Sequence, residues 1–387
     1  MNNTARSPRV PARAESVGSL MRPTQVKTLL QEIYGAHATA SAQVLSERER
    51  AKLEELESAV DGLLEDLVAR QVAAGLDVVT DGELRRAMFT ASVTDALGGT
   101  AEKEHDVEFK DERGSDASVP SDPIFVGQVQ KTASPAVREI RALRSVTDHP
   151  FKVTFPAASY WLYPSSTFDE AAYTSRDELV DDVVAVTREL VEEAIEEGAR
   201  HVQLDFPIYP LFADEGKRDA MLDELGESAE SLLAKGIAAD NRVIEGLPDG
   251  VVTAMHICRG NYRSRWWLEG SLEPVAEALF GQLRYDRFLV EWDDVSREGD
   301  YEALRHVPEG PIVVMGLISS KKADVEDDDE VLRRLEQAER SLDVEQLALS
   351  PQCGFASTWH GNELTEDRQW RKLEVVGRVA DRVWNGR

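Results

Sequence analysis

The chain has 387 residues, of which 42% are hydrophobic, and its 44 Lys and Arg residues against 72 Asp and Glu residues give a formal net charge of -28. Such a surface repels nucleic-acid phosphates and anionic lipids, and no basic cluster offsets it, so we expect no nucleic-acid partner. No apolar stretch approaches the roughly 20 residues that span a bilayer, and residues 1–16 contain no apolar signal core, which predicts a cytoplasmic protein with no membrane partner.

Eight short strand-like runs alternate with long amphipathic stretches along the chain. In chain order the runs are AESVGSL (14–20), LDVVTDGE (76–83), FKVTFPA (151–157), HVQLDFPI (201–208), VVTAMHICRG (251–260), RFLVEWDD (287–294), PIVVMGLIS (311–319) and LALSPQC (347–353). Apolar positions three and four apart predict helices over residues 58–75, 176–199, 228–247, 327–342 and 365–384. Strand and helix repeated eight times predict an α/β protein with a (β/α)8 TIM barrel.

The barrel accounts for almost the whole chain as one domain. We expect residues 1–13 to form a disordered tail and residues 14–387 to form a single catalytic barrel. The long gap between the second and third runs holds extra material that is charged and rich in turn-forming residues, and it ends in a short strand-like piece. This composition predicts a loop or hairpin excursion at about residues 100–130.

Only two cysteines occur in the chain, and each lies in a segment that is typical of a metal ligand. His256 and Cys258 are two apart on a predicted strand, so their side chains point the same way. Cys353 ends the eighth run, and Glu291 lies at the end of the sixth. Imidazole, two thiolates and a carboxylate suit zinc, whereas the alternative is two buried free thiols and a core histidine. Cysteines 95 positions apart make a disulfide framework unexpected, and a reducing compartment would leave both thiols free for a metal.

A barrel of this type places its active site where the strands end and the following loops gather. Polar residues or glycine end most of the eight runs. A surface turn could explain any one of these residues, but it explains the whole set poorly. They are Gly18, Ser19, Asp81, Glu83, Asp205, His256, Cys258, Glu291, Ser319, Lys321 and Cys353. We therefore expect residues nearly 340 positions apart to face one cavity.

Seven of these segments carry a family resemblance. In order they are ESVGSL, VVTDGELRR, VQLDFP, HICRGN, VEWDD, GLISSKKADVE and LSPQCGF. From about Ala14 to the C-terminus, the chain resembles the catalytic domain of cobalamin-independent methionine synthase and its shorter single-barrel relatives. The resemblance implies a barrel of the methionine synthase and uroporphyrinogen decarboxylase type, with Zn²⁺ bound by His256, Cys258, Glu291 and Cys353. It also implies a pocket for the amino-acid part of homocysteine, lined by Val17, Gly18, Ser19, Glu83 and Asp205.

The implied reaction transfers an alkyl group, methyl in the favoured case, to a small-molecule thiol such as homocysteine, with methionine as the product. The donor could be methyl-folate, methylcobalamin or an epoxide. Its leaving group needs a proton, for which the general-acid candidates are Asp81, Glu83 and Lys321. Arg259 and Asn261 directly follow the ligand strand and could contact a substrate carboxylate or sulfonate, or only cap the loop. Residues 160–161, a Tyr–Trp pair, could stack on a flat donor or belong to the core.

Two positions depart from the pattern of full-length methionine synthases. Phe206 stands where those enzymes have a second acidic residue, and Lys321 stands about where they have a histidine. A lysine there resembles the shorter relatives, which include epoxyalkane:coenzyme M transferases, so an epoxide-opening reaction is one alternative. A metal-free lyase of the uroporphyrinogen decarboxylase type and a non-catalytic zinc-binding barrel are the others. A closed structural zinc site usually has four protein ligands with more cysteines than this chain offers.

Overall fold

The computed structural model describes residues 12–37, 39–102 and 122–385. A single sheet of six parallel strands lies at its centre, and each strand neighbours the next one in sequence. The strands are β3 (Lys152–Pro156), β4 (His201–Asp205), β5 (Val252–Ile257), β6 (Arg287–Glu291), β7 (Ile312–Ile318) and β8 (Leu347–Pro351). Most of the predicted tail, residues 1–11, lies outside the described residues.

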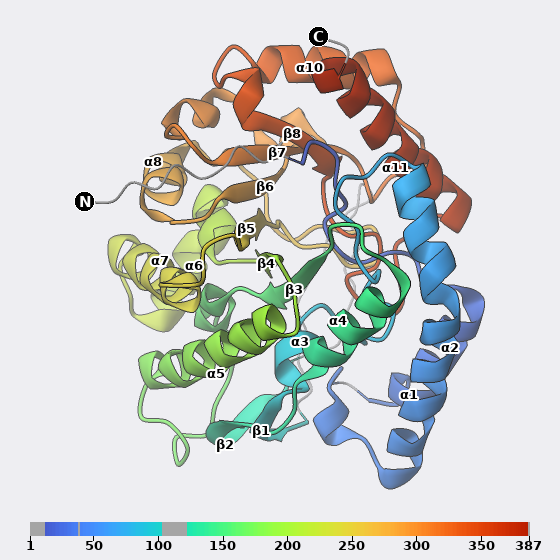
Figure 1. Ribbon diagram of the computed structural model, residues 1–387. Helices are drawn as coiled ribbons and strands as arrows, with labels where there is room; N and C mark the ends of the chain where they lie inside the picture. Colours follow the sequence, from blue (N-terminus) through green and yellow to red (C-terminus); the bar gives the residue numbers. More distant parts are fainter. Residues whose placement is uncertain (1–11, 38, 103–121, 386–387) are drawn as a thin grey trace.

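Two short segments take the first two strand positions and close the sheet. Isolated parallel bridges pair Ala14 with Leu349 of β8, Glu15 with Val78, and Val79 with Phe151 directly before β3. The prediction of eight strand positions is confirmed, although the first two form only these bridges rather than full strands. The chain is a (β/α)8 barrel, and Figure 1 shows its strands at the centre with helices around them.

The helices lie on the outside of the barrel, where their apolar faces cover the strands. They are α1 (Thr24–Tyr34), α2 (Glu47–Ala73), α3 (Ala91–Thr94), α4 (Pro135–Val146), α5 (Arg176–Glu196), α6 (Glu215–Leu225), α7 (Ala229–Ile244), α8 (Glu273–Gln282), α9 (Val295–Glu298), α10 (Asp328–Ala338) and α11 (Glu366–Ala380). Within the described ranges, no helix is both long enough and apolar enough to cross a membrane.

Helix α2 begins at Glu47, well before residue 58, where the apolar spacing predicted its start. Ser46 and Glu49 form a capping box, in which each side chain accepts a hydrogen bond from the backbone N–H of the other. Such a box satisfies two N–H groups that a helix start leaves free. The polar first turns of α2 therefore depend on the cap, which a search for apolar periodicity does not detect.

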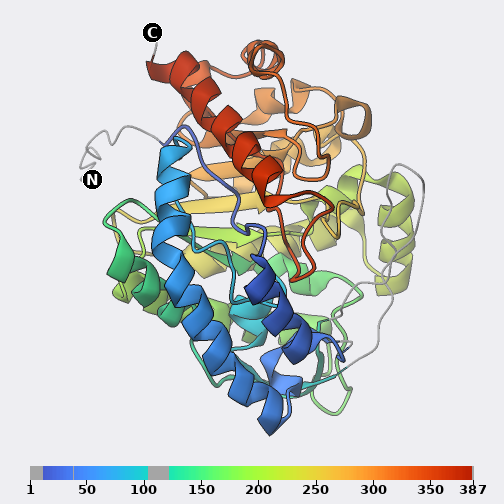
Figure 2. The ribbon, with the colours of Figure 1, turned by 90° about the vertical axis from the view of Figure 1, so that its right-hand side faces the viewer.

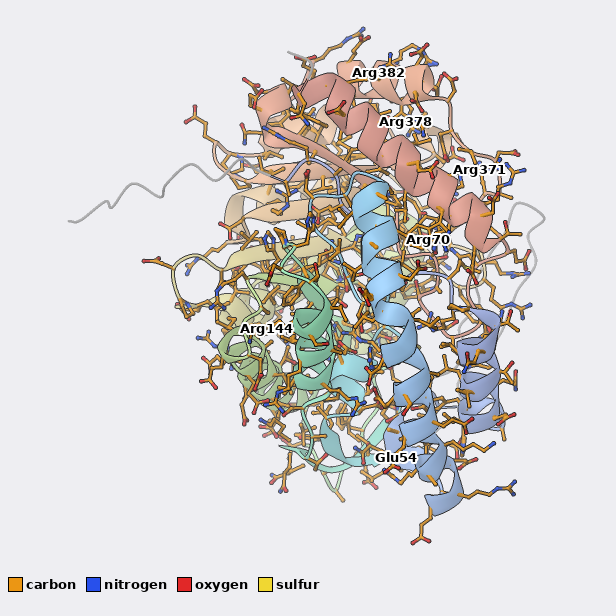
Figure 3. The ribbon with its side chains drawn as sticks, turned by 45° about the vertical axis from the view of Figure 1, so that its right-hand side comes forward. Glu54, Arg70, Arg144, Arg371, Arg378 and Arg382 are labelled. Carbon is orange, nitrogen blue, oxygen red and sulfur yellow. The ribbon has the colours of Figure 1, made fainter. Side chains whose placement is uncertain are left out.

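One side of the barrel is covered by α1, α2 and α11 packed side by side (Figure 2). The backbones of α2 and α11 approach so closely that a Cβ at Gly377 would lie 2.0 Å from the carbonyl oxygen of Ala74, so only glycine fits there. Figure 3 shows arginines along the outer face of this layer. Arg70 lies 4.2 Å from the ring centre of Trp370, and Arg378 pairs with Asp328 of α10 at 2.8 Å.

The material between the second strand position and β3 contains an antiparallel pair of strands, β1 (Leu97–Ala101) and β2 (Ile124–Lys131). Lys131 joins this pair to α5 through Glu189, at 2.6 Å, and through Glu193. The excursion predicted at about residues 100–130 falls partly on residues 103–121, which lie outside the described residues.

A buried ion cluster lies at the N-terminal ends of the strands. The carboxylate of Glu15 accepts hydrogen bonds from Lys152, the first residue of β3, at 2.8 Å and from Arg287, the first residue of β6, at 2.5 Å. Lys152 also donates to Gln203 at 2.7 Å. Burial raises the pKa of Glu15, but Arg287 and Lys152 outweigh burial and bring that pKa to about 2. The polar cluster thus joins four strand positions, the first, third, fourth and sixth, at the end of the barrel opposite the predicted site.

We expect Glu15→Gln to lower the free energy of unfolding by about 3 to 5 kcal/mol at neutral pH, because it leaves two buried cations short of their partner. Since the pKa of Glu15 is depressed, its contribution is present above pH 4.5 and is lost as the pH falls toward 2. We therefore expect the free energy of unfolding, measured in urea across this pH range, to fall less steeply toward low pH in the variant than in the unaltered protein. The control is Glu345→Gln, which breaks an ion pair of an exposed glutamate with Arg13 and should cost less than about 1 kcal/mol.

Candidate metal centre

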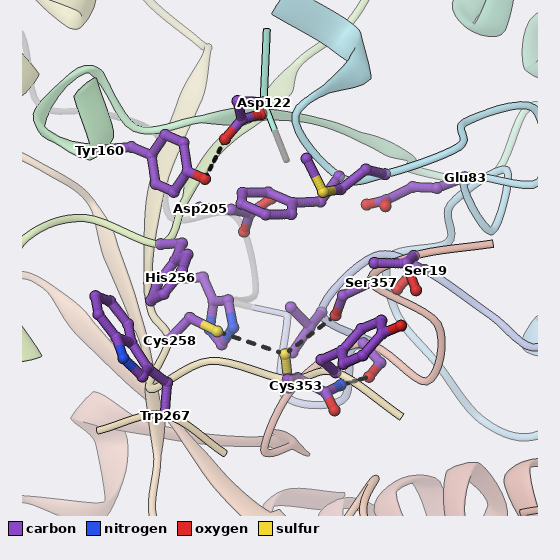
Figure 4. Close-up of a pocket in the computed structure, with 18 of the residues that line it drawn as sticks. Ser19, Glu83, Asp122, Tyr160, Asp205, His256, Cys258, Trp267, Cys353 and Ser357 are labelled. Carbon is purple, nitrogen blue, oxygen red and sulfur yellow. Dashed lines mark hydrogen bonds between the residues drawn. The ribbon is translucent and has the colours of Figure 1, made fainter. Parts of the chain in front are cut away.

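Four side chains converge at the C-terminal ends of three strands, β5, β6 and β8. His256 is the last residue but one of β5, and Cys258 directly follows that strand. Glu291 is the last residue of β6, and Cys353 comes two residues after the end of β8. One donor atom from each residue lies within 4.8 Å of all the others, and all four residues are buried. The four residues that the sequence predicts as zinc ligands therefore meet at one point. Figure 4 shows three of them, His256, Cys258 and Cys353.

The donor set fits a tetrahedral zinc ion. The sulfur atoms of Cys258 and Cys353 are 3.7 Å apart, and two sulfurs bound at about 2.3 Å to one tetrahedral zinc would lie about 3.8 Å apart. Nδ1 of His256 faces the carbonyl oxygen of Leu289 at 3.3 Å, while its Nε2 is buried and has no hydrogen-bond partner among the described residues. A zinc-binding histidine commonly donates one ring N–H to a backbone carbonyl and binds the metal through the other nitrogen.

Glu291 is held by three other groups besides the cluster. One carboxylate oxygen accepts the backbone N–H of Arg259 at 2.9 Å. The other lies 3.2 Å from Nζ of Lys321 and 3.4 Å from Nε2 of Gln352. Burial lowers the pKa of Lys321, but Glu291 and Asp293 outweigh burial and keep this lysine charged. The carboxylate thus already contacts one cation and two neutral donors besides the cluster.

The two thiols differ in protonation when no metal is bound. A hydrogen bond from Cys258 lowers the pKa of Cys353 well below its usual range, whereas burial raises the pKa of Cys258. Cys353 is thus the more acidic thiol of the pair, and Cys258 holds the proton of the hydrogen bond between them. Because zinc binds thiolates, metal binding would release that proton.

A second group of acidic side chains lies beside this cluster but does not have the character of a metal site. Glu291, Asp293 and Glu298 also offer oxygens within 4.8 Å of one another. Arg297 contacts both Asp293 and Glu298 at 2.8 Å, so a fixed guanidinium already neutralises them. The cluster with the two thiols differs from this acidic group, because within the described residues it leaves Nε2 of His256 buried without a hydrogen-bond partner.

A cavity of about 110 Å³ opens directly above the cluster. His256, Cys258 and Cys353 line its floor, so a ligand in the cavity reaches the donor atoms (Figure 4). Of the residues that the sequence predicts for the substrate pocket, five side chains line this cavity: Val17, Ser19, Glu83, Asp205 and Asn261. The cavity therefore joins the first, second, fourth and fifth strand positions to the metal cluster.

The two carboxylates in the cavity wall, Glu83 and Asp205, are buried. Thr154 donates a hydrogen bond to Glu83 at 2.9 Å, and Gln203 donates one to Asp205 at 2.7 Å. Burial raises the pKa of both groups and brings that of Asp205 to about 7. Glu83 reaches the cavity from a left-handed turn in which its own φ is 52°. Burial and this strained backbone are typical of a residue that a binding site holds in place.

Four predicted site residues lie behind the cavity rather than in it. Gly18 packs against Glu83, where a Cβ would lie 2.4 Å from the carboxylate oxygen. Asp81 accepts the backbone N–H of Glu83 at 2.9 Å, and Lys321 pairs with Glu291. Arg259 points away and donates to the carbonyl of Gly270 at 2.7 Å. Of the two roles expected for Arg259, the structure shows contacts that hold the loop: its side chain donates to Gly270 and its backbone N–H donates to Glu291.

Several cavity residues lie outside the predicted set. Asp122 accepts hydrogen bonds from Tyr160 and, at 2.9 Å, from Thr90. Tyr160 lines the cavity, but its neighbour Trp161 is fully buried behind it. Other lining residues are Met88, Phe89, Tyr163, Ser165, Tyr262, Trp267, Gly354, Ser357 and Thr358. The Asp–Pro step at residues 122–123, just before a strand-like piece, is the one sequence signal that points to Asp122.

Comparisons with known proteins agree with this geometry. The Bacillus subtilis protein YxjH, whose function is uncharacterized, is 32% identical over 98% of this chain and 97% of its own. A methionine synthase from Pyrococcus abyssi is 21% identical over 80% of both chains. The structure of a B12-independent methionine synthase from Shewanella sp. W3-18-1, in complex with selenomethionine, superposes with a TM-score of 0.70 at 25% identity and covers 97% of this chain and 98% of that one. The family model of the cobalamin-independent synthase catalytic domain matches residues 35–368, and the chain belongs to this family.

Proposed function

We propose that this protein transfers a methyl group to the thiol of homocysteine, giving methionine, with a zinc ion held by His256, Cys258, Cys353 and Glu291. The observation that carries the proposal is the convergence of these four donors at the floor of a cavity. Family membership supports an alkyl-transfer enzyme of the methionine synthase type. A structural zinc site would be closed, whereas this cluster is open to a ligand on one side.

A free alkyl thiol is mostly protonated at neutral pH, with a pKa of about 8.5, and only its thiolate is a strong nucleophile. Bound zinc would hold the substrate sulfur as a thiolate. The two cysteine thiolates alone would balance the charge of the ion, so a bound substrate sulfur would stay rich in electrons. His256 and the two cysteines keep their places on the strand ends, which fixes the sulfur beneath the cavity.

Glu291 is suited to leave the metal when the thiol arrives. Lys321, Gln352 and the backbone N–H of Arg259 already contact its carboxylate and would receive it. We therefore expect zinc K-edge absorption to show one oxygen ligand replaced by sulfur when homocysteine is added. In Glu291→Gln, which lacks the carboxylate, adding homocysteine should add a sulfur ligand to zinc without removing a carboxylate oxygen. A zinc spectrum that the thiol leaves unchanged would contradict the exchange.

The cavity offers groups for an amino-acid substrate. The carboxylates of Glu83 and Asp205 can bind its ammonium group, and Oδ1 of Asn261 is buried without a hydrogen-bond partner and lines the same cavity. Ser19 and nearby backbone groups can bind its carboxylate. Selenomethionine, bound by the related Shewanella enzyme, is an amino acid with a methylated chalcogen, which supports methionine as the product here.

The main alternative acceptor is coenzyme M, whose sulfonate is an anion. No lysine or arginine lines the cavity within the described part of the chain, and Arg259 turns away from it. The carboxylates in the cavity wall attract the ammonium group of homocysteine. At the same distance they would repel the sulfonate of coenzyme M. The lining therefore favours homocysteine and a methyl donor over an epoxide and coenzyme M.

The test uses three forms of the protein: as purified, stripped by a chelator, and reloaded with zinc. Each is offered homocysteine or coenzyme M together with methyl-folate, methylcobalamin or a small epoxide. We expect methionine to form from homocysteine and a methyl donor, to stop on stripping and to return with zinc. Epoxide opening by coenzyme M, or equal rates in stripped and reloaded protein, would overturn the proposal.

A further inference from the structure

One wall of the cavity is formed by five aromatic side chains that contact one another. We call this set the aromatic wall; its members are Phe89, Tyr160, Tyr163, Phe206 and Trp267, and all five line the cavity. Neighbouring ring centres lie 5.2 to 6.1 Å apart in edge-on or tilted contacts. Phe206 touches the other four. Its φ of 56° is left-handed, so the backbone is held in an unfavourable conformation to place this ring.

Apart from His256 of the metal cluster, the cavity wall holds no basic side chain within the described residues. Glu83, Asp122 and Asp205 line it, and across the ranges that the structure describes no lysine or arginine does. Arg86 approaches Glu83 only from behind, at 3.8 Å, and is paired with Glu139. Lys217 lies 5.9 Å from the ring of Trp267 and is not among the lining residues. An aromatic surface with carboxylates and without cations is suited to a positively charged ligand.

The carboxylates divide between two ligands. Glu83 and Asp205 lie near the metal cluster, where the amino group of the acceptor is expected. Asp122 lies apart from them, hydrogen-bonded to Tyr160 of the aromatic wall (Figure 4). Neither the acceptor nor the metal uses the aromatic wall or Asp122, so these groups remain for the methyl donor.

Building on the proposed methyl transfer, we propose that the donor is a methyl onium cation, a methylsulfonium or a quaternary methylammonium compound, bound by the aromatic wall and Asp122. The acceptor thiolate uses its electron pair to form a bond to the methyl carbon. The bond from that carbon to the positive sulfur or nitrogen breaks, and its electron pair stays on the leaving atom. A neutral sulfide or amine departs together with a neutral thioether, so no proton is required.

This charge balance fits the positions of the general-acid candidates. Of the three candidates, Asp81 and Lys321 do not reach the cavity, as they would have to in order to protonate a leaving group. Glu83 does line the cavity, but there it is assigned to the ammonium group of the acceptor. Methyl-folate would need such a proton, and its polyglutamate tail would bring negative charge to an acidic wall. An onium donor needs neither a proton nor a basic pocket, and its methyl groups match the faces of aromatic rings.

The binding test compares tetramethylammonium with neopentyl alcohol, a neutral molecule of similar shape, by calorimetry on the zinc-loaded protein with homocysteine bound. We expect the cation to bind about tenfold more tightly or better. Asp122→Asn and Trp267→Leu should each weaken tetramethylammonium binding about tenfold and leave homocysteine binding within about twofold. Trp266→Leu is the matched control, because that ring stacks on Arg297 outside the cavity and its loss should change neither ligand.

The turnover test offers trimethylsulfonium as the donor and measures methionine and dimethyl sulfide in equal amounts. Equal affinities for the cation and the neutral molecule would overturn the onium donor, as would methionine formed from methyl-folate or methylcobalamin but not from trimethylsulfonium. In the latter case the proposed methyl transfer to homocysteine stands. If homocysteine fails to bind the zinc-loaded protein, the proposed function itself is wrong.

Discussion

Cys353→Ser should reduce bound zinc from about one ion per chain to nearly none and lower methyl transfer by ~10³-fold or more, because the variant loses one of two thiolates that hold the metal. Its sulfur lies 3.7 Å from that of Cys258, so the pair acts as one unit. Metal analysis and the rate of methionine formation measure the two effects. We expect the fold to remain, since serine is close to cysteine in size and the buried ion cluster lies at the other end of the barrel.

Glu298→Gln is the control for this variant. It alters the neighbouring acidic group, which Arg297 already neutralises, and should leave the zinc content unchanged. Full zinc retention in Cys353→Ser would exclude the thiol from the ligand set. Unfolding of Cys353→Ser, seen by circular dichroism, would instead favour the non-catalytic zinc barrel.

Glu83→Gln should lower kcat/KM for homocysteine by roughly 100-fold, mostly through KM, because a buried carboxylate that binds an ammonium group is replaced by a neutral amide. Glu83 is buried in the cavity wall and is held by Thr154 at 2.9 Å. The measurement is steady-state kinetics with homocysteine and with 4-mercaptobutanoate, which lacks the amino group.

The comparison of the two thiols isolates the role of Glu83. With 4-mercaptobutanoate the variant should match the unaltered protein within about threefold, since there is no ammonium group to lose. Asp81→Asn provides a second control, because Asp81 supports the Glu83 backbone without reaching the cavity. An equal loss with both thiols would show that Glu83 maintains the cavity and does not bind the amino group.

The metal cluster could be predicted from the sequence because its signals are local and repeated. Two-residue spacing on a strand puts His256 and Cys258 on one side, and the barrel brings the strand ends carrying Glu291 and Cys353 to the same place. Arg259 follows this strand in a loop, where strand alternation does not say which way a side chain points.

The rest of the site depends on loop paths, which no periodic pattern describes. Lys321 meets Glu291 only because the loop after β7 turns back over β6. Asp122 belongs to the β1–β2 region and meets Tyr160, 38 residues later, across the mouth of the barrel. Phe206 was noticed as a departure from the family, but its contacts with four other rings arise from three different loops and from its own left-handed backbone.

We expect the substrate sulfur to bind directly to the metal that His256, Cys258 and Cys353 hold, in the place that Glu291 leaves. The most direct test is X-ray absorption at the selenium edge of the zinc-loaded protein mixed with selenohomocysteine. The account predicts a zinc neighbour at bonding distance from selenium, and predicts its loss in Cys353→Ser. A selenium atom surrounded only by light atoms in protein that retains its zinc would contradict the account.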